Sequence, residues 1–119
     1  MRRDLDLVRD ILKTCADSTG PVDAATFTDD THPLESIVYH IRIMREAGLI
    51  HATVTSTWDG VVRARVDSLT WEGNDFLDSV RSNQLWAKTK QRIASTVGSV
   101  AFSVVKDVAT SIATTMIGL

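Results

Sequence analysis

The feature that most constrains the fold is a helical pattern that runs directly into a hairpin pattern between residues 32 and 73. Pro33 suits the first turn of a helix, because its missing N–H would have no partner there. Gly48 suits the position just after the last turn, where a left-handed backbone is common. We therefore predict a helix over about Pro33 to Ala47 and a strand that starts at Leu49-Ile50. The predicted buried stripe is Leu34, Ile37, Val38, Ile41, Met44 and Ala47, and the predicted outward face is Glu35, Ser36, Tyr39, His40, Arg42, Ile43 and Glu46.

The next stretch, residues 50–68, alternates in the manner of two antiparallel strands. A two-residue turn at Asp59-Gly60 would mix the two faces of such a hairpin. A three-residue loop, Trp58-Asp59-Gly60, keeps the faces apart and places Gly60 where a left-handed backbone is needed. We predict this register, which pairs Val54 with Ala64 and Ser56 with Val62. One face is then expected to pack on helices, and the other to carry threonines, Arg63 and Arg65, with Trp58 at the tip.

The segment before the Pro33 helix is predicted to hold one long helix and a weakly patterned connection. The helix spans about Arg3 to Ala16, with acidic residues near its positive end. Residues 24–28 are expected to form a short strand beside the hairpin. Because residues 18–32 leave room for barely one helical turn, we expect either an abbreviated helix-turn-helix or a Pro33 helix that serves both roles. The predicted buried stripe of the first helix is Leu5, Val8, Ile11, Leu12 and Cys15, with Cys15 as a packed small hydrophobe rather than a reactive thiol.

A further helix is predicted directly after the hairpin. Thr70 is a suitable N-cap, and Glu72 adds negative charge to the first turn. Ser82-Asn83 either interrupts this helix or caps a new one. The residues expected to face the core are Trp71, Phe76, Leu77 and Val80.

Together these elements predict an α+β fold, a winged helix-turn-helix over residues 1–82 with a long C-terminal helical extension over residues 83–119. Several motifs occur in a characteristic order: Asp4-Leu5-Asp6-Leu7 with Ile11-Leu12, Tyr39-His40 before Glu46-Ala47-Gly48-Leu49-Ile50, Leu69-Thr70-Trp71-Glu72-Gly73 with Phe76-Leu77, and Trp86-x-Lys88-Thr89-Lys90. With these motifs the chain resembles the family known as domain of unknown function 2513. Its members are small proteins of bacteria and their phages, similar to winged helix-turn-helix regulators. The resemblance implies a fold and a regulator-like class, and it implies no mechanism.

Charge is distributed unevenly along the chain, with −3 over residues 1–34, −3 over residues 35–80 and +4 over residues 81–119. Four basic residues without intervening acids, Arg81, Lys88, Lys90 and Arg92, accompany Trp86 in the last part. This strip either contacts nucleic-acid phosphates or is a solvated helix face with Trp86 packed against the first helix.

Residues 93–119 combine an apolar stripe with small residues and only two charges, Lys106 and Asp107. The uncharged runs on either side are too short to span a bilayer. A small domain rarely leaves such a stripe in water, so we expect it to pack on a second copy, on its own domain or on a membrane surface. The predicted oligomer interface is Val97, Val100, Val104, Val108, Ile112 and Met116.

Composition excludes several classes of protein. A net charge of −2 is no overall footprint of a nucleic-acid-binding protein, and a single cysteine fits a reducing compartment. The first residues lack the apolar region of a signal peptide, so we expect a cytoplasmic protein. His32, His40 and His51 show no metal-ligand spacing, and no phosphate loop or nucleophile motif is present in the sequence. We predict no catalysis, no metal and no cofactor.

Two functions remain open. In the first, the chain is a regulator that binds double-stranded DNA, with the Pro33 helix in the major groove and the hairpin along the backbone. The residues predicted to contact DNA are Ser36, Tyr39, His40, Arg42, Arg63, Arg65, Lys88 and Lys90. In the second, the chain is an interaction module for another protein, for instance a host protein if a phage encodes it, with residues 93–119 and the Trp58 tip as contact surfaces. Self-association is expected in the first case and compatible with the second.

Overall fold

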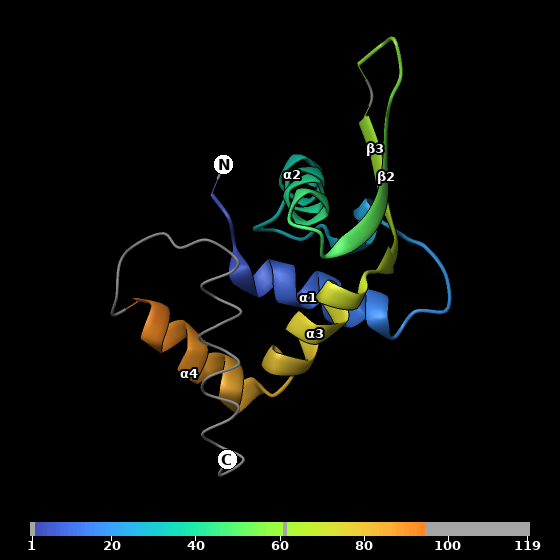
Figure 1. Cartoon of the computed structure of the whole chain (residues 1–119). Helices are drawn as coiled ribbons and strands as arrows, with labels where there is room; N and C mark the ends of the chain where they lie inside the picture. The colour runs from blue at the N-terminus through green and yellow to red at the C-terminus, as the bar shows by residue number, and fades with distance from the viewer. Residues whose placement is uncertain (1, 61, 95–119) are drawn as a thin grey trace. The chain divides into compact units, whose positions relative to one another are not determined.

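A computed structural model describes residues 2–60 and 62–94 of the chain (Figure 1). Two compact units are present, of which the first ends at Asn74 and the second begins at Asp75. The elements in chain order are α1 (Leu5–Ala16), β1 (Val22–Asp23), the 3-10 helix η1 (Ala24–Phe27), α2 (Leu34–Glu46), β2 (Ile50–Ser56), β3 (Val62–Leu69), α3 (Trp71–Val80) and α4 (Asn83–Ala94). The mixed α+β class with a winged hairpin is therefore confirmed, whereas most of the predicted extension, residues 95–119, lies outside the described residues.

Helix α1 begins with a side-chain cap. The Asp4 carboxylate accepts hydrogen bonds from the backbone N–H groups of Asp6 and Leu7, at 3.0 and 3.2 Å. These are donors that the first turn of any helix leaves without an intrahelical partner. The buried face holds Leu7, Val8, Arg9, Ile11 and Leu12. The predicted stripe was right in its middle and wrong at its ends, because Leu5 and Cys15 are only half-buried while Leu7 is buried.

A three-stranded antiparallel sheet in the order β1-β3-β2 forms the other layer of the first unit. Strand β1 pairs Val22 with Val66 and Asp23 with Arg65. The prediction of a strand over residues 24–28 was wrong, because the strand lies just before them, at Val22–Asp23, and residues 24–27 form η1. The Asp23 carboxylate caps η1 by accepting a hydrogen bond from the N–H of Ala25 at 3.0 Å. The single short turn of η1 stands where a second helix would be, so the abbreviated form of the motif is the one present.

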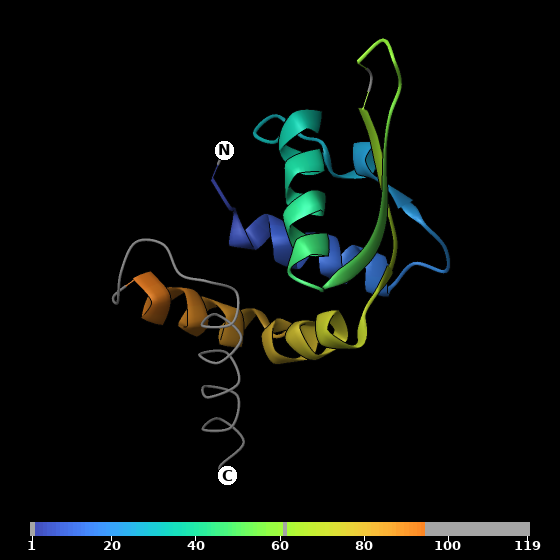
Figure 2. The same ribbon diagram turned by 45° about the horizontal axis from the view of Figure 1, so that its top comes forward.

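The hairpin formed by β2 and β3 has the predicted register. Val54 pairs with Ala64 and Ser56 with Val62, and Gly60 has φ +88°, as the loop requires. The register shifts between His51 and Ala52, which leaves one extra residue in β3 and bends the hairpin at its base. Both views show the far end of the hairpin projecting beyond α2 (Figures 1 and 2).

Helix α2 lies beside the hairpin and, with η1 and α1, covers one face of the sheet (Figure 2). Gly48 ends it with φ +78°. The core between these layers is made of Val8, Ile11, Leu12, Ile37, Ile41, Met44, Leu49, Ile50, Ala64 and Val66, all nearly inaccessible to solvent. Two members of the predicted stripe, Leu34 and Ala47, are exposed instead. Leu34 lies in the first turn of α2 and Ala47 at its C-cap, so both are at ends of the helix that the sheet does not cover.

The junction between α2 and α3 explains the Thr-Trp-Glu-Gly motif. Thr70 caps α3, since its Oγ1 accepts from the N–H of Gly73 at 3.0 Å and donates to the carbonyl of Gly48 at 2.5 Å. A Cβ atom on Gly73 would lie 1.9 Å from the carbonyl oxygen of Leu49, so only glycine fits. The predicted cap is confirmed, but the prediction that Trp71 faces the core was wrong, because its side chain is 82% exposed.

The second unit contains the rest of α3 and α4. Ser82 caps the new helix α4, as its Oγ accepts from the N–H of Leu85 at 3.3 Å. Burial of Phe76, Leu77 and Val80 is as predicted, and Leu85, Trp86 and Thr89 are buried as well. The Nζ atom of Lys90 lies 5.8 Å from the centre of the Trp86 ring, a cation–π contact. Across residues 2–60 and 62–94, no helix has the length and apolar character that crossing a membrane requires.

Candidate interaction surface on α2 and the hairpin

The predicted contact residues of α2 are placed in three different environments. Arg42 is exposed, Ser36 and Tyr39 are half-buried, and His40 is only 1% exposed. The prediction that His40 lies on the outward face was therefore wrong. Its spacing from Ile37 and Met44, three and four residues, places it on the core face, and that spacing could have revealed its burial from the sequence.

The buried ring of His40 connects α2 with the start of α1. Its Nε2 accepts a hydrogen bond from the backbone N–H of Asp4 at 2.9 Å, and its Nδ1 donates to the carbonyl of Ser36 at 2.7 Å. Because the Asp4 N–H can only donate, these two bonds fix the tautomer that carries its proton on Nδ1. Both ring nitrogens are thus committed inside the fold, and His40 has a structural role.

A second histidine joins the loop before α2 to the cap of α1. His32 Nε2 lies 2.9 Å from the Asp4 carboxylate, and its Nδ1 lies 3.0 Å from the Asp29 carboxylate. Hydrogen bonds to Asp4 and then to Asp29 raise the pKa of His32. The hydrogen bond with His32, followed by hydrogen bonds from the side chain and backbone of Thr31, lowers the pKa of Asp29 to about 2.

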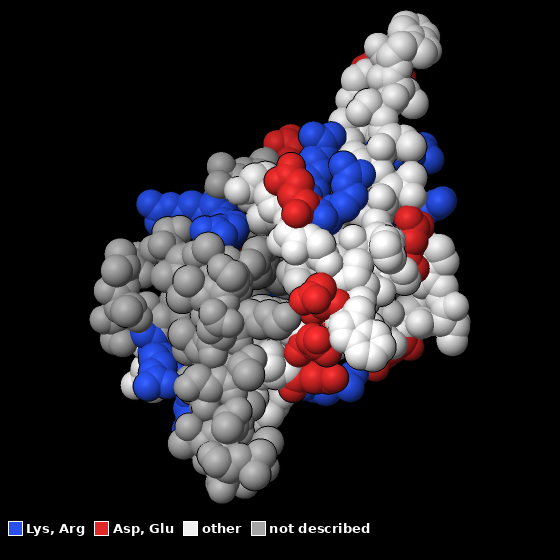
Figure 3. Space-filling model, in the orientation of Figure 1, with Lys and Arg blue, Asp and Glu red and all other residues white. Residues whose placement is uncertain are grey.

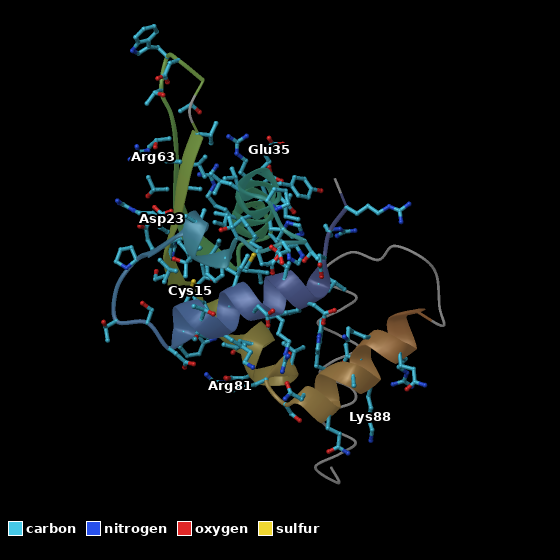
Figure 4. The ribbon with its side chains drawn as sticks, turned by 180° about the vertical axis from the view of Figure 1, so that it is seen from behind. Cys15, Asp23, Glu35, Arg63, Arg81 and Lys88 are labelled. Carbon is cyan, nitrogen blue, oxygen red and sulfur yellow. The ribbon has the colours of Figure 1, made fainter. Side chains whose placement is uncertain are left out.

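The two arginines of the hairpin lie on the face of the sheet that points away from α2. Arg63 and Arg65 alternate with the buried Ala64 and the equally buried Val66, which fixes their side. In Figure 4, Arg63 points away from α2 on one side of the hairpin, while Glu35 lies on α2 on the other side. Arg42 and the hairpin arginines are consequently separated by the hairpin itself.

The arginine-bearing face also contains acidic partners. Arg65 Nε donates to the Asp67 carboxylate at 2.8 Å, and Thr53 Oγ1 donates to the same group at 2.7 Å. The Thr53 bond, followed by the Arg65 bond, lowers the pKa of Asp67. A shallow pocket of about 220 Å³ on this face is lined by Asp23, Thr53, Thr55, Arg63, Ala64 and Arg65. Its charges are mixed, so the face offers no purely positive surface.

The charge of the first unit as a whole is negative. Residues 1–74 contain eight lysines and arginines against twelve aspartates and glutamates. Figure 3 shows acidic and basic side chains next to each other over α2, and the visible end of the hairpin carries no basic side chain. The positive strip that a duplex backbone would require is interrupted within this unit.

An apolar groove lies between α2 and the start of β3. It has a volume of about 410 Å³, is open to solvent, and is lined by Leu34, Glu35, Val38, Tyr39, Arg42 and Val62. Leu34 is 44% exposed at one end of the groove. The α2 residues recur every three or four positions and therefore form one continuous wall. Sequence reasoning missed the groove, because nothing local reveals that Val62 faces this wall.

The hairpin ends in a fully exposed aromatic residue. Trp58 is 100% exposed, as predicted for the tip. Its neighbour Asp59 accepts a short hydrogen bond from Thr57 Oγ1, and Gly60 N–H donates to the Thr57 carbonyl at 3.0 Å. Tryptophan is enriched among the residues that dominate protein interfaces, so its exposure at the end of a hydrogen-bonded turn makes Trp58 a candidate contact residue.

The remaining predicted contact residues either belong to α4 in the second unit or lie outside the described residues. Lys88 is exposed on α4 and Lys90 is half-buried beside Trp86. The predicted oligomer interface, Val97 to Met116, lies outside the described residues.

Among residues 2–60 and 62–94, no three His, Cys, Asp or Glu side chains are grouped in a way that could hold a metal ion. Burial raises the pKa of Cys15 to about 11.

Helices that cover one face of a small sheet and a hairpin that extends past them define a winged-helix protein. A solved crystal structure with this fold, from a candidate transcriptional regulator of Thermoplasma acidophilum, is similar at a TM-score of 0.50 and 22% sequence identity, covering 77% of this chain and 93% of that chain. At that identity the likeness shows the fold alone.

Comparison of sequences assigns the family. Residues 2–99 match the family described as "Hypothetical protein (DUF2513)". A protein of Haemophilus influenzae described as an "Uncharacterized protein" is 31% identical over 121 residues, which cover 98% of this chain and 99% of that protein. The chain belongs to the DUF2513 family, and the resemblance found in its motifs is confirmed.

Proposed function

We propose that this chain is a non-catalytic, regulator-like winged-helix protein that acts by binding another protein chain through the groove between α2 and β3. The observation that carries the proposal is the groove itself, which is open to solvent, mostly apolar and about 410 Å³ in volume. One of its walls is α2, in the position of the helix that many winged-helix proteins use for recognition. The regulator-like part draws support from the fold and from the description of the Thermoplasma protein as a candidate transcriptional regulator.

Charge favours a protein partner over DNA. A duplex backbone attracts clustered lysines and arginines, and the first unit has an excess of acids. Protein interfaces instead have an apolar core in which aromatic residues and arginine are enriched, surrounded by a polar rim. Leu34, Val38 and Val62 provide such a centre, with Tyr39 and Arg42 at its border.

The non-catalytic part draws support from the roles of the polar residues. His40 has both ring nitrogens in structural hydrogen bonds, and His32 bridges the Asp4 and Asp29 carboxylates. The groove offers one carboxylate, Glu35, and one guanidinium, Arg42, without an activated nucleophile beside them.

Duplex DNA is the second candidate partner, because one specific observation favours it. Arg42 is exposed on the helix that corresponds to a recognition helix, and Arg63 is exposed on the hairpin next to it. Lys88 on α4 would add a phosphate contact if both units reached one duplex. Binding of this kind would weaken steeply with added salt.

Photo-crosslinking from inside the groove tests the two candidates together. A photoreactive phenylalanine analogue replaces Tyr39, and a control chain carries it at the exposed Thr14 of α1. We expect adducts from position 39 in living cells that protease removes and nuclease does not, in excess over those from position 14. Adducts removed by nuclease would establish the DNA candidate. Equal labelling from both positions would contradict both candidates.

A further inference from the structure

We propose that the groove between α2 and β3 receives Trp58 from a second copy of this chain, and that the exchange is reciprocal. The inference rests on the proposed function, because it assigns a first occupant to the protein-binding groove. Each copy would insert the end of its hairpin between α2 and β3 of the other copy. A two-fold axis would relate the two contacts, so that both grooves are filled at once.

The groove is an open apolar surface, and Trp58 is an exposed apolar side chain that could fill it. Trp58 is 100% exposed, so the groove of its own chain does not receive it. The walls formed by Leu34, Val38 and Val62 would remove an indole from water, which is the main source of affinity for an aromatic anchor. Burial of this one side chain would therefore satisfy both exposed surfaces.

The polar rim of the groove matches the polar parts of the hairpin end. Arg42 lies on the wall, where a guanidinium can stack on the indole face. Glu35 offers a carboxylate that can accept the indole N–H, which is a donor only. Asp59, directly after Trp58, brings a negative charge toward the same arginine. The indole N–H and the Asp59 carboxylate would thus each meet a complementary group on the wall.

The shape of the hairpin permits the exchange. Its end projects beyond α2 in both views (Figures 1 and 2). Trp58 lies two residues beyond Ser56, the partner of Val62, so the tip reaches roughly 7 Å past Val62 at the usual rise of a strand. Two hairpins that lie antiparallel and overlap by this length would bring each tryptophan level with Val62 of the other copy.

The size of the contact predicts a weak dimer. A buried tryptophan removes about 150–250 Å² of its own surface from water, and two such anchors with their walls remain below the roughly 1,200 Å² of a standard stable interface. The association should therefore depend on protein concentration, and loss of either half of the contact should abolish it.

Sedimentation of the full chain and three variants tests the proposal. Trp58→Ala removes the anchor, Leu34→Glu places a charge at the exposed mouth of the groove, and Trp71→Ala is the matched control, since Trp71 is exposed but lies outside both surfaces. We expect the native chain and Trp71→Ala to dimerise alike. Trp58→Ala and Leu34→Glu should each raise the dimer dissociation constant at least tenfold.

Mixing the two deficient variants gives the decisive readout. Trp58→Ala keeps its groove and Leu34→Glu keeps its tryptophan, so a mixed pair retains one of the two contacts, whereas each variant alone retains none. We expect more dimer in the mixture than in either variant at the same total concentration. Circular dichroism spectra equal to that of the native chain establish that both variants are folded.

Three results would overturn the inference: a native chain that stays monomeric, a Trp58→Ala dimer as tight as the native one, or a mixture no more dimeric than its components. The two tests can fail separately. If position 39 crosslinks to a protein other than this chain, and Trp58→Ala and Leu34→Glu leave self-association unchanged, the proposed function stands and only the second copy is excluded as occupant.

Discussion

The backbone N–H of Asp4 donates to Nε2 of His40, with 2.9 Å between the two nitrogens. This single bond links the first residue of the α1 cap to the middle of α2, 36 positions away in the chain. Since the opposite ring nitrogen donates to the Ser36 carbonyl, one planar ring serves as acceptor toward α1 and as donor within α2.

Replacement of His40 should therefore cost stability rather than ligand affinity. His40→Leu keeps much of the volume but leaves the Asp4 N–H without its partner, at a cost of about 1–3 kcal/mol of unfolding free energy. Urea denaturation measures the change. Arg42→Leu, on the exposed face of the same helix, is the control and should change the unfolding free energy by less than about 0.5 kcal/mol. Equal effects of the two substitutions would contradict the structural role of His40.

Gly73 should not tolerate any side chain. In Gly73→Ala the new Cβ atom would meet the Leu49 carbonyl oxygen at 1.9 Å, and a backbone atom cannot rotate away as a side chain can. We expect a loss of about 3 kcal/mol or more, at the upper end of what overpacking costs. Gly20→Ala is the matched control, because no atom lies within 4 Å of its Cβ position. Thermal or urea unfolding of both variants decides the matter, and a Gly73→Ala chain as stable as Gly20→Ala would contradict the packing described.

The hairpin could be predicted from the sequence down to its register, because alternation with a period of two leaves one arrangement that keeps Val54 and Ala64 on the same face. The strand at Val22–Asp23 could not, since two residues are too few to show a period. His40 was assigned to the surface by residue type although its spacing placed it in the core. The helical period tells which residues share the buried face. Whether a polar residue on that face finds hydrogen-bond partners depends on the elements packed against it, here α1.

The groove shows the limit of this reasoning more clearly. Its helical wall from Leu34 to Arg42 is visible in the sequence as a periodic set. Its other wall, Val62, comes from a strand that begins 20 residues later. No local pattern gives the distance between two such segments, because that distance is set by the packing of α2 on the sheet. The exposure of Leu34 was not predicted for the same reason, because the apolar stripe of a helix does not show how far the sheet packed on it extends.

His32 should make stability fall as the pH rises above 6.5, the ordinary pKa of histidine. Its pKa is raised by hydrogen bonds to Asp4 and to Asp29, relative to an ordinary value of 6.5. A raised value in the folded state means that the protonated ring is bound more tightly after folding. This contribution is complete below pH 6.5 and is lost as the pH rises through the pKa of the folded protein. We expect His32→Gln to destabilise the chain at pH 5.5 and to have a smaller effect at pH 9, measured by urea unfolding at both values.

The control for this pH effect is His51→Gln, a change at an exposed histidine outside the Asp4–His32–Asp29 cluster. As a substitution on the surface, it should change the unfolding free energy less than His32→Gln does at pH 5.5. Asp29 adds a contribution of the opposite sign, because its pKa is lowered from 3.8 to about 2. That contribution is present above pH 3.8 and is lost as the pH falls toward 2. A His32→Gln effect that is larger at pH 9 than at pH 5.5 would contradict the arrangement.

Cys15 should behave as a packed side chain and not as a reactive thiol. Burial raises its pKa from 9.0 to about 11, so at pH 8 it holds on the order of a hundred times less thiolate than an unperturbed group. Because the thiolate is the nucleophile, alkylation by iodoacetamide should slow by a similar factor in the folded chain. Mass spectrometry follows the reaction, and the same chain in urea provides the control with an accessible thiol. The rate should rise tenfold for each pH unit up to about pH 10 and level off only near 11. A plateau below pH 9 in the folded chain would show instead that Cys15 is activated, and that the half-buried end of α1 is a reactive site.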